Sequence, residues 1–316
     1  MRLHFQKMNT VDIVSYILLA LCLVMGILSV LHERFLHANW FTNWFIQENG
    51  LIVTEPYQNA KSMQSDKQIS ADESTVFLIN MQKNKDRLQR FVDSYKKTDL
   101  KDVPFMRIEG VNGRKLDLSK WVSPQALPLL LDNEAKGYRQ YHYQLTRGAV
   151  GCYLSHLNVY KEFLKTNKEY AFIFEDDVRF NENQVIGELN KVMDTIPRNW
   201  DIILLGCVCF VCGKFQSYYD VNRYFLMHGY VVRRSSAQKM LDHLDGKPIE
   251  QQIDAKLSDL TEKNEMRIYC LRKKIASQWN MGTGIQIPVK NSKGVNPFET
   301  YHESNTDNNP YSDDED

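Results

Sequence analysis

The sequence lacks net charge, because 39 Lys and Arg residues balance 39 Asp and Glu residues over 316 positions. That balance excludes a strongly basic nucleic-acid-binding protein and an acidic, wholly disordered chain. The hydrophobic fraction of 43% and the charged fraction of 25% are typical of a globular protein. The neutrality is uneven, however. Residues 303–316 hold six acids and no Lys or Arg, which leaves +6 (39 minus 33) on residues 1–302.

Asn-x-Ser/Thr sequons are absent, so glycosylation gives no guide to topology. Cysteine is sparse. One of the six lies in an apolar run near the N-terminus, and the other five are Cys152, Cys207, Cys209, Cys212 and Cys270. Five is an odd number, so no complete disulfide framework follows. The run from 207 to 212 leaves a zinc site, a disulfide in a lumenal compartment and unpaired small side chains open, although no second Cys or His pair has zinc-finger spacing.

A membrane anchor is predicted at Ile13–Leu31, which contains 19 residues without a charge. A helix of this length roughly spans a hydrocarbon core. Arg2 and Lys7 precede it, so we expect residues 1–12 in the cytosol and the remainder in a lumen or outside. A cleaved signal peptide and a buried soluble helix are the alternatives. The region lacks a clear small-residue cleavage site, and the run has almost no polar face.

The remaining chain divides into a spacer, a folded region and a tail. Residues 32–72 begin with clustered aromatics and continue with polar residues, as expected of a stem. From residue 73 to about 290, short apolar runs alternate with helical patterns. We expect strands at 75–80, 103–108, 170–174, 202–205 and 229–233, and helices at 85–95, 148–164 and 235–244. This alternation predicts an α/β sheet with helices on both faces, followed by an acidic, disordered tail at 291–316.

Three consecutive acids, Glu175, Asp176 and Asp177, follow the strand predicted at 170–174. In α/β sheets, ligands bind beyond the carboxyl ends of the strands. Neighbouring carboxylates repel one another, and a hard divalent cation such as Mn²⁺ or Mg²⁺ relieves that repulsion. Strand alternation predicts that Glu175 and Asp177 point to one side and Asp176 to the other. A solvated loop or a helix N-cap is the simpler alternative.

The motif before the triplet gives it a context. Residues 148–156 read Gly-Ala-Val-Gly-Cys-Tyr-Leu-Ser-His, and residues 172–178 read Phe-Ile-Phe-Glu-Asp-Asp-Val about one helix later. The pair resembles glycosyltransferase family 25, whose pattern is Gly-x-x-Gly-Cys-x-x-Ser-His and then an apolar strand ending in Glu-Asp-Asp. That family includes bacterial lipopolysaccharide galactosyltransferases and procollagen galactosyltransferases. Weaker matches in the same order extend the resemblance over roughly residues 75–280, with Ala149 standing where many members carry Glu.

The resemblance implies a GT-A-type, Rossmann-like nucleotide-sugar-binding domain that takes a UDP-sugar, often UDP-galactose, and inverts the anomeric carbon with a divalent metal, Mn²⁺ or Mg²⁺. The acceptor is expected to be a protein or glycan hydroxyl. With the anchor, it predicts a single-pass type II membrane protein facing the Golgi or ER lumen. A catalytically inactive relative that serves as an adhesion or scaffold protein is the alternative from another class, and a thiol or zinc module is a third.

Roles for single residues follow from the resemblance and from side-chain chemistry. We expect Glu175 and Asp177, joined by His228, to hold the metal. Inversion needs a base for the acceptor proton, for which Asp254 is the candidate, and Asp176 is assigned to the catalytic group beside it. Contacts to the donor nucleotide are expected from Asn80, Arg87, Ser155, His156 and Glu175. For Arg87 and Asp254 an exposed helix position, and for His156 a structural role, are equally simple explanations.

Overall fold

The computed structural model describes residues 68–141, 143–279 and 287. The predicted tail 1–12, the anchor at Ile13–Leu31, most of the stem 32–72 and the acidic tail 291–316 lie outside these residues. Within the described part, no helix combines the length and apolar character needed to cross a membrane. The packed chain already includes Ile69, which is 1% exposed and exchanges two backbone hydrogen bonds with the Asn190 side chain. Packing therefore begins earlier than the predicted boundary at residue 73.

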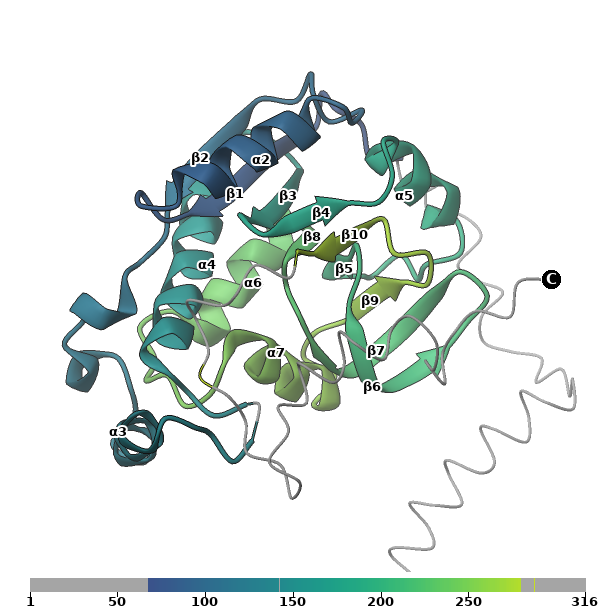
Figure 1. Cartoon of the computed structure of the whole chain (residues 1–316). Helices are drawn as coiled ribbons and strands as arrows, with labels where there is room; N and C mark the ends of the chain where they lie inside the picture. The colour runs from purple at the N-terminus through teal and green to yellow at the C-terminus, as the bar shows by residue number, and fades with distance from the viewer. Residues whose placement is uncertain (1–67, 142, 280–286, 288–316) are drawn as a thin grey trace, which may run out of the picture. The chain divides into compact units, whose positions relative to one another are not determined.

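The centre of the fold is a mixed eight-stranded sheet (Figure 1). In spatial order its strands are β2 (Phe105–Glu109), β1 (Ser74–Asn80), β3 (Tyr170–Glu175), β8 (Gly229–Arg233), β5 (Ile202–Leu204), β9 (Ile268–Leu271), β7 (Tyr218–Phe225) and β6 (Val208–Lys214). The first three run parallel, whereas β8 is antiparallel to both of its neighbours. A separate two-stranded sheet pairs β4 (Val178–Phe180) with β10 (Ala276–Gln278).

Helices cover both faces of the sheet, as the alternating pattern predicts. They are α2 (Lys85–Tyr95), α3 (Ala126–Lys136), α4 (Arg147–Lys165), α5 (Val185–Met193), α6 (Arg234–Leu244) and α7 (Ile253–Glu262). Apolar residues of α4, α6 and α7 pack with inward-facing strand residues such as Phe77 and Ile173 on one face. Those of α2 and α5 pack on the other face with Phe172 and Phe174. Alternate residues of one buried strand thus enter two separate cores.

Two disulfides join four of the five cysteines that follow the apolar run. Cys207 pairs with Cys270 across the β5–β6 connection and β9, and Cys209 pairs with Cys212 within β6. Their Cα atoms are 6.4 and 6.2 Å apart, within the range that a disulfide can bridge. These bonds use the thiols that a zinc site at this run would require, which favours the disulfide alternative over zinc. Cys152 is the free cysteine of the described residues.

Candidate active site

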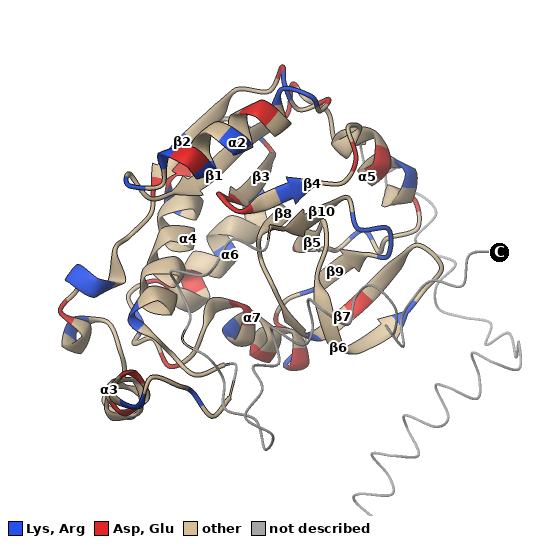
Figure 2. Cartoon of the chain, in the orientation of Figure 1, with Lys and Arg blue, Asp and Glu red and all other residues tan. Residues whose placement is uncertain are grey.

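A cavity of about 390 Å³ lies at the carboxyl ends of β1, β2 and β3. Its volume lies in the range of small-molecule sites. The cavity is lined by backbone and side chains of three segments and of the acidic turn: Ile79, Met81, Lys83, Asn84, Arg87, Gly110, Val111, Asn112, Gly113, Arg114, Gly148, Cys152, Ser155, Glu175, Asp176 and Asp177. Figure 2 shows acidic residues at the turn between β3 and β4, and charges of both signs on the surrounding helices and loops.

Two glycines let α4 pack directly against the loop that follows β2. A Cβ on Gly151 would collide with the carbonyl oxygen of Val111, and a Cβ on Gly113 would collide with that of Arg147. Ser155 joins the same two segments, because its Oγ accepts from the Val111 N–H at 2.8 Å and donates to the Gly151 carbonyl at 2.7 Å. The Gly-x-x-Gly-Cys-x-x-Ser motif therefore builds one wall of the cavity through close backbone approach.

Both carboxylate oxygens of Asp176 have hydrogen-bond partners. It is 8% exposed, and its Oδ2 accepts from Asn80 Nδ2 at 2.7 Å and from Asn84 Nδ2 at 3.2 Å. Its Oδ1 accepts from Arg87 Nη1 at 3.0 Å. Asn80 is itself fixed, since Arg107 Nε donates to its Oδ1 at 2.8 Å. Both oxygens of Asp176 are thus compensated, and Asn80 acts by orienting this carboxylate.

Asp177 has a different environment, although it is equally buried at 9% exposure. Its Oδ2 accepts from Gln278 Nε2 at 2.8 Å and lies 3.7 Å from Arg87 Nη1. Its Oδ1 is buried and has no hydrogen-bond partner. Burial, together with the negative charges of Glu175 and Asp176, raises the pKa of Asp177 to about 7 despite Gln278 and Arg87. A buried carboxylate oxygen without a partner is a donor atom suited to a hard cation.

Glu175 faces the motif helix. His156 Nε2 lies 3.2 Å from its Oε1, and the Cys152 thiol donates to the same oxygen at 3.7 Å. The other ring nitrogen of His156 contacts the Tyr230 hydroxyl at 2.8 Å, which in turn contacts the Tyr160 hydroxyl at 2.8 Å. Burial alone would raise the pKa of Glu175, but the hydrogen bonds from His156 and Cys152 and the electrostatic interactions with His156 and His228 together lower that pKa.

Cys152, His156 and Glu175 together place a sulfur, a nitrogen and an oxygen within 4.8 Å of one another. We interpret this group as a hydrogen-bonded support for Glu175. Both nitrogens of His156 already have partners, and burial raises the pKa of the Cys152 thiol well above its usual range, which keeps the sulfur protonated.

The predicted alternation of the three acids is wrong. Strand β3 ends at Glu175, and residues 176 and 177 form a tight turn into β4, so strand geometry no longer sets their directions. Asp176 and Asp177 both approach Arg87 Nη1, at 3.0 and 3.7 Å, while Glu175 turns towards His156. All three nevertheless line the same cavity.

His228 lies behind the acids and does not line the cavity. The Glu175 N–H donates to the His228 carbonyl at 3.0 Å, so the two residues sit side by side on β3 and the start of β8. His228 Nε2 contacts the Ala276 carbonyl at 3.2 Å, and its Nδ1 is buried without a partner. Burial lowers the pKa of His228, which favours the neutral ring. His156, fully buried, also stays out of the cavity lining.

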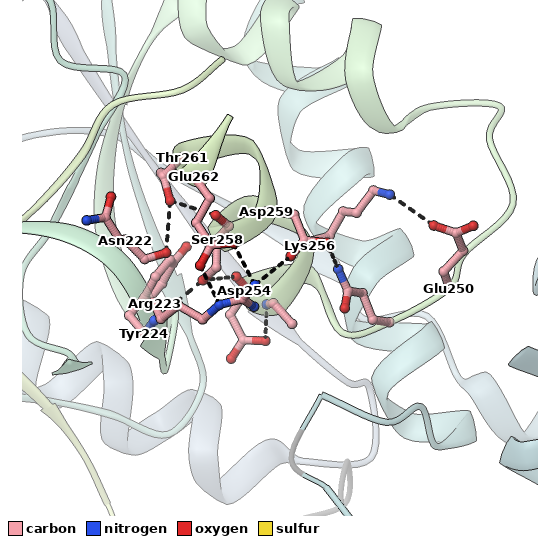
Figure 3. A network of polar contacts seen from close by, with 12 residues as sticks. Asn222, Arg223, Tyr224, Glu250, Asp254, Lys256, Ser258, Asp259, Thr261 and Glu262 are labelled. Atoms are coloured by element: carbon pink, nitrogen blue, oxygen red, sulfur yellow. Dashed lines mark hydrogen bonds and ion pairs between the residues drawn. The ribbon is translucent and has the colours of Figure 1, made fainter. Parts of the chain in front are cut away.

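Asp254 lies in the first turn of α7 (Figure 3). Like His228 and His156, it is absent from the cavity lining. Its carboxylate accepts from the Ala255 N–H at 2.8 Å and from the Leu226 N–H at 3.4 Å. Leu226 has φ 80°, an uncommon left-handed conformation for leucine. Burial, with a further contribution from Glu175, raises the pKa of Asp254 to about 6. The expectation of an exposed helix position is therefore wrong.

Sequence reasoning identified the acids and Arg87 but missed several residues that build the site. Lys83, Asn84 and Arg114 line the cavity, and Gln278 binds Asp177. For Lys83 and Asn84 a signal existed, since they directly follow the first predicted strand. For Gln278 the signal was one of the weaker matches to the family pattern, at residues 275–278, and it indicated no partner because Gln278 lies 101 residues after Asp177.

Comparison with known proteins gives a consistent family match. The profile of glycosyltransferase family 25 (LPS biosynthesis protein) matches residues 73–256. Human procollagen galactosyltransferase 2 is 31% identical over 184 residues, which cover 52% of this chain and 27% of the relative. A bovine probable inactive glycosyltransferase 25 family member 3 is 30% identical over 138 residues, covering 42% and 21%. The chain thus matches about a quarter of the length of these relatives.

Among solved structures, a Drosophila galactosyltransferase 7 in complex with manganese, UDP-Gal and xylobiose aligns over 67% of this chain and 71% of its own, with 9% identity and a TM-score of 0.34. A similarity this low supports no inference about the fold or the function.

Proposed function

The chain belongs to glycosyltransferase family 25, and we propose that it transfers a sugar, with galactose expected, from a UDP-sugar to a hydroxyl group of a protein or glycan. The observation that carries this proposal is the buried acidic turn at one wall of a nucleotide-sized cavity. A GT-A-type domain, inversion at the anomeric carbon and a divalent metal are part of the proposal. Galactose is suggested by the names of the procollagen galactosyltransferase relatives.

Binding of a nucleoside diphosphate is supported by the cations around the cavity. Lys83, Arg87 and Arg114 contribute to its lining, and Arg87 lies 3.0 Å from Asp176 and 3.7 Å from Asp177. Guanidinium groups donate two parallel hydrogen bonds to phosphate oxygens, and an ammonium supplies a compact positive charge. We assign the donor diphosphate to these three residues. Asp176 keeps Arg87 in place through the 3.0 Å contact.

A divalent cation fits the buried donor atoms of this site. We assign Asp177 Oδ1 and His228 Nδ1 as its ligand atoms, because both are buried without partners. Glu175, whose N–H donates to the His228 carbonyl, is kept as the third ligand. Among the described residues the ligand atoms of these three side chains do not all lie within 4.8 Å of one another, so this set requires side-chain movement on binding. Oxygen ligands with one imidazole suit Mn²⁺. When bound, the metal would supply electrostatic stabilisation of the departing diphosphate.

Proton removal from the acceptor hydroxyl is assigned to Asp254. A carboxylate with a pKa of about 6 is ionised at neutral pH and is a better proton acceptor than an ordinary aspartate. The Leu226 and Ala255 N–H groups hold the carboxylate in one orientation. Asp176 is assigned to the catalytic group through its hold on Arg87.

A lumenal location, with the anchor at Ile13–Leu31 and a type II topology, completes the proposal. The two disulfides support an oxidising compartment, since such bonds are rare in the cytosol. A protease-protection assay on the C-terminal tail tests this assignment, and digestion of the tail in intact vesicles would contradict it.

The decisive experiment is a donor screen that measures release of UDP from UDP-sugars, with and without Mn²⁺, followed by mass analysis of the acceptor. We expect hydrolysis with at least one UDP-hexose that requires Mn²⁺ and is lost in Asp177→Ala. Asp132→Ala is the matched control, because Asp132 is an exposed helix acid paired with Lys136. Absence of hydrolysis and of UDP binding by the wild type would contradict the enzyme proposal.

An inactive scaffold is the second candidate, favoured by the match to relatives named as inactive. It predicts no turnover with any donor. The intact Glu175–Asp177 triplet argues against it, because uncompensated buried charge costs stability that a protein without a cation to bind has no reason to retain.

A further inference from the structure

The short strand β10 contacts both side chains that carry a buried, unpartnered donor atom at this site. It is three residues long, pairs with β4, and comes about 100 residues after the acidic turn. Its Ala276 carbonyl contacts His228, and its Gln278 side chain contacts Asp177. In each case one polar atom of the partner is occupied and the other is left free.

The contact to His228 determines which ring nitrogen carries hydrogen. A backbone carbonyl only accepts hydrogen bonds, so His228 Nε2 at 3.2 Å must be the donor. In the neutral ring the lone pair then resides on Nδ1, the atom that has no partner. The Ala276 carbonyl oxygen packs directly against the backbone of Gly206, where a Cβ would collide with it. This close packing keeps the carbonyl in place.

The contacts to Asp177 fix both its side chain and its main chain. Gln278 Nε2 donates to Oδ2 at 2.8 Å, and the Trp279 N–H donates to the Asp177 carbonyl at 2.8 Å. The carboxylate of Asp177 therefore has one orientation set by β10, with Oδ1 left unpartnered at 9% exposure of the residue.

We propose that β10 is the positioning element of the metal site, in which Gln278 and the Ala276 carbonyl present Asp177 Oδ1 and His228 Nδ1 to a divalent cation. Metal-binding histidines commonly donate their second ring nitrogen to a carbonyl, and metal-binding carboxylates are commonly hydrogen-bonded in the same way. This inference rests on the proposed metal-dependent function and adds a residue, Gln278, whose role is orientation.

The neighbouring residue on β10 provides a matched control. Ser277 Oγ donates to Asn181 Oδ1 at 2.9 Å, in an exposed contact away from Asp177. Ser277→Ala therefore removes a hydrogen bond from the same strand without touching the proposed ligands. Gln278→Met keeps the length of the side chain and removes its amide, and Gln278→Ala removes the side chain altogether.

The experiment titrates the full-length protein with Mn²⁺ alone and follows free Mn²⁺ by electron paramagnetic resonance, without nucleotide. We expect Gln278→Met and Gln278→Ala to weaken Mn²⁺ binding about 10- to 100-fold, the usual effect of removing such a support. Ser277→Ala should bind like the wild type. Asp177→Asn, which removes the ligand itself, should bind weakest. Thermal unfolding in EDTA should show similar midpoints for the wild type and for both Gln278 variants.

The outcomes separate this inference from the function on which it rests. If both Gln278 variants bind Mn²⁺ within twofold of the wild type while Asp177→Asn loses binding, the positioning role is overturned and the metal site stands. If Gln278→Met and Ser277→Ala weaken binding equally, β10 is only a structural strand and the inference is overturned. If the wild type binds no Mn²⁺, the proposed metal dependence is overturned together with it.

Discussion

Asp176 and Asp177 are neighbours with nearly equal exposure, 8% and 9%, but they differ in their hydrogen-bond partners. Asp176 contacts residues of β1 and of the segment that follows it, the β1 side of the site, and Asp177 contacts β10, the β10 side. On the β1 side, Asn80, Asn84 and Arg87 compensate both oxygens of Asp176. On the β10 side, Asp177 keeps one unpartnered oxygen and has a raised pKa. Buried polar atoms normally have hydrogen-bond partners. A buried oxygen without a partner, such as Asp177 Oδ1, destabilises the fold, and such a cost is commonly found at functional sites.

The difference in hydrogen bonding indicates a structural role for Asp176 and a ligand-binding role for Asp177. A carboxylate whose two oxygens both have partners, such as Asp176, stabilises the fold and orients the Arg87 side chain. Removing one of its partners lowers the stability of the protein. An uncompensated carboxylate destabilises the apo fold and gains from a ligand. The β10 side should therefore respond to mutation in activity. We expect the same of Asp254, whose two oxygens accept backbone hydrogen bonds but whose pKa is raised by burial to about 6. On the β1 side, Asn80 and Asn84 should respond mainly in stability, whereas Arg87, which we also assign to the donor diphosphate, should respond in both stability and UDP affinity.

The largest effect is expected for Asp254→Asn, which preserves shape and removes the proton acceptor. We expect kcat to fall by about 10² to 10⁴, with UDP and Mn²⁺ affinities unchanged, in steady-state transfer assays. Asp259→Asn is the control on the same helix, since Asp259 makes a partly exposed ion pair with Arg223 (Figure 3). Equal loss of activity in both variants would show that α7 matters only as a structural element.

The pH dependence of stability tests the two carboxylates whose pKa values are raised, Asp177 and Asp254. The folded-state pKa values of Asp177 (about 7) and Asp254 (about 6) exceed their unfolded values near 4, so the folded state binds more protons in this range. Stability should therefore fall as pH rises from about 4 to 7. Asp177→Asn should remove the Asp177 share, on the order of 4 kcal/mol at pH 8. Urea unfolding in EDTA measures it, and identical pH profiles of mutant and wild type would contradict the comparison.

Arg87→Met should lower the stability of the protein, in contrast to the expected effect of Asp177→Asn. It leaves the buried Asp176 carboxylate with amide partners alone, and we expect a loss of about 3 kcal/mol in the free energy of unfolding. Arg90→Met is the control, because Arg90 is exposed on the same helix and donates to a backbone carbonyl. A loss below about 1 kcal/mol would mean that Asp176 is not held as tightly as its contacts indicate.

How far the sequence predicts this site depends on how local its causes are. The strand and helix around the Glu-Asp-Asp and Gly-x-x-Gly-Cys motifs follow from apolar periodicity, and β8 and α2 occur with the predicted bounds. The direction of β8, antiparallel to β3 and β5, has no local signal. The hairpin of β6 and β7 was missed because register shifts at Val211 interrupt the alternation that marks a strand.

The same reasoning explains the errors at the acids. The alternation rule fails from Asp176 onward because a turn begins there, and turn geometry depends on what the next strand pairs with. The unequal compensation of Asp176 and Asp177 comes from residues of α2 and β10, which only the folded chain brings together. Periodicity therefore locates the site, and long-range contacts assign its roles.

The smallest effect is expected inside the network behind Glu175. Tyr160→Phe removes one hydroxyl from the Tyr160–Tyr230–His156 chain and should cost about 1 kcal/mol. His156 keeps its partners, so the hydrogen bond that orients Glu175 survives and kcat should stay within about twofold of the wild type. Tyr153→Phe, elsewhere on the same helix, is the control for loss of a tyrosine hydroxyl. A large loss of activity with unchanged stability would place Tyr160 on the functional side of the comparison, because it would mean that Glu175 is oriented through the whole chain of hydroxyls.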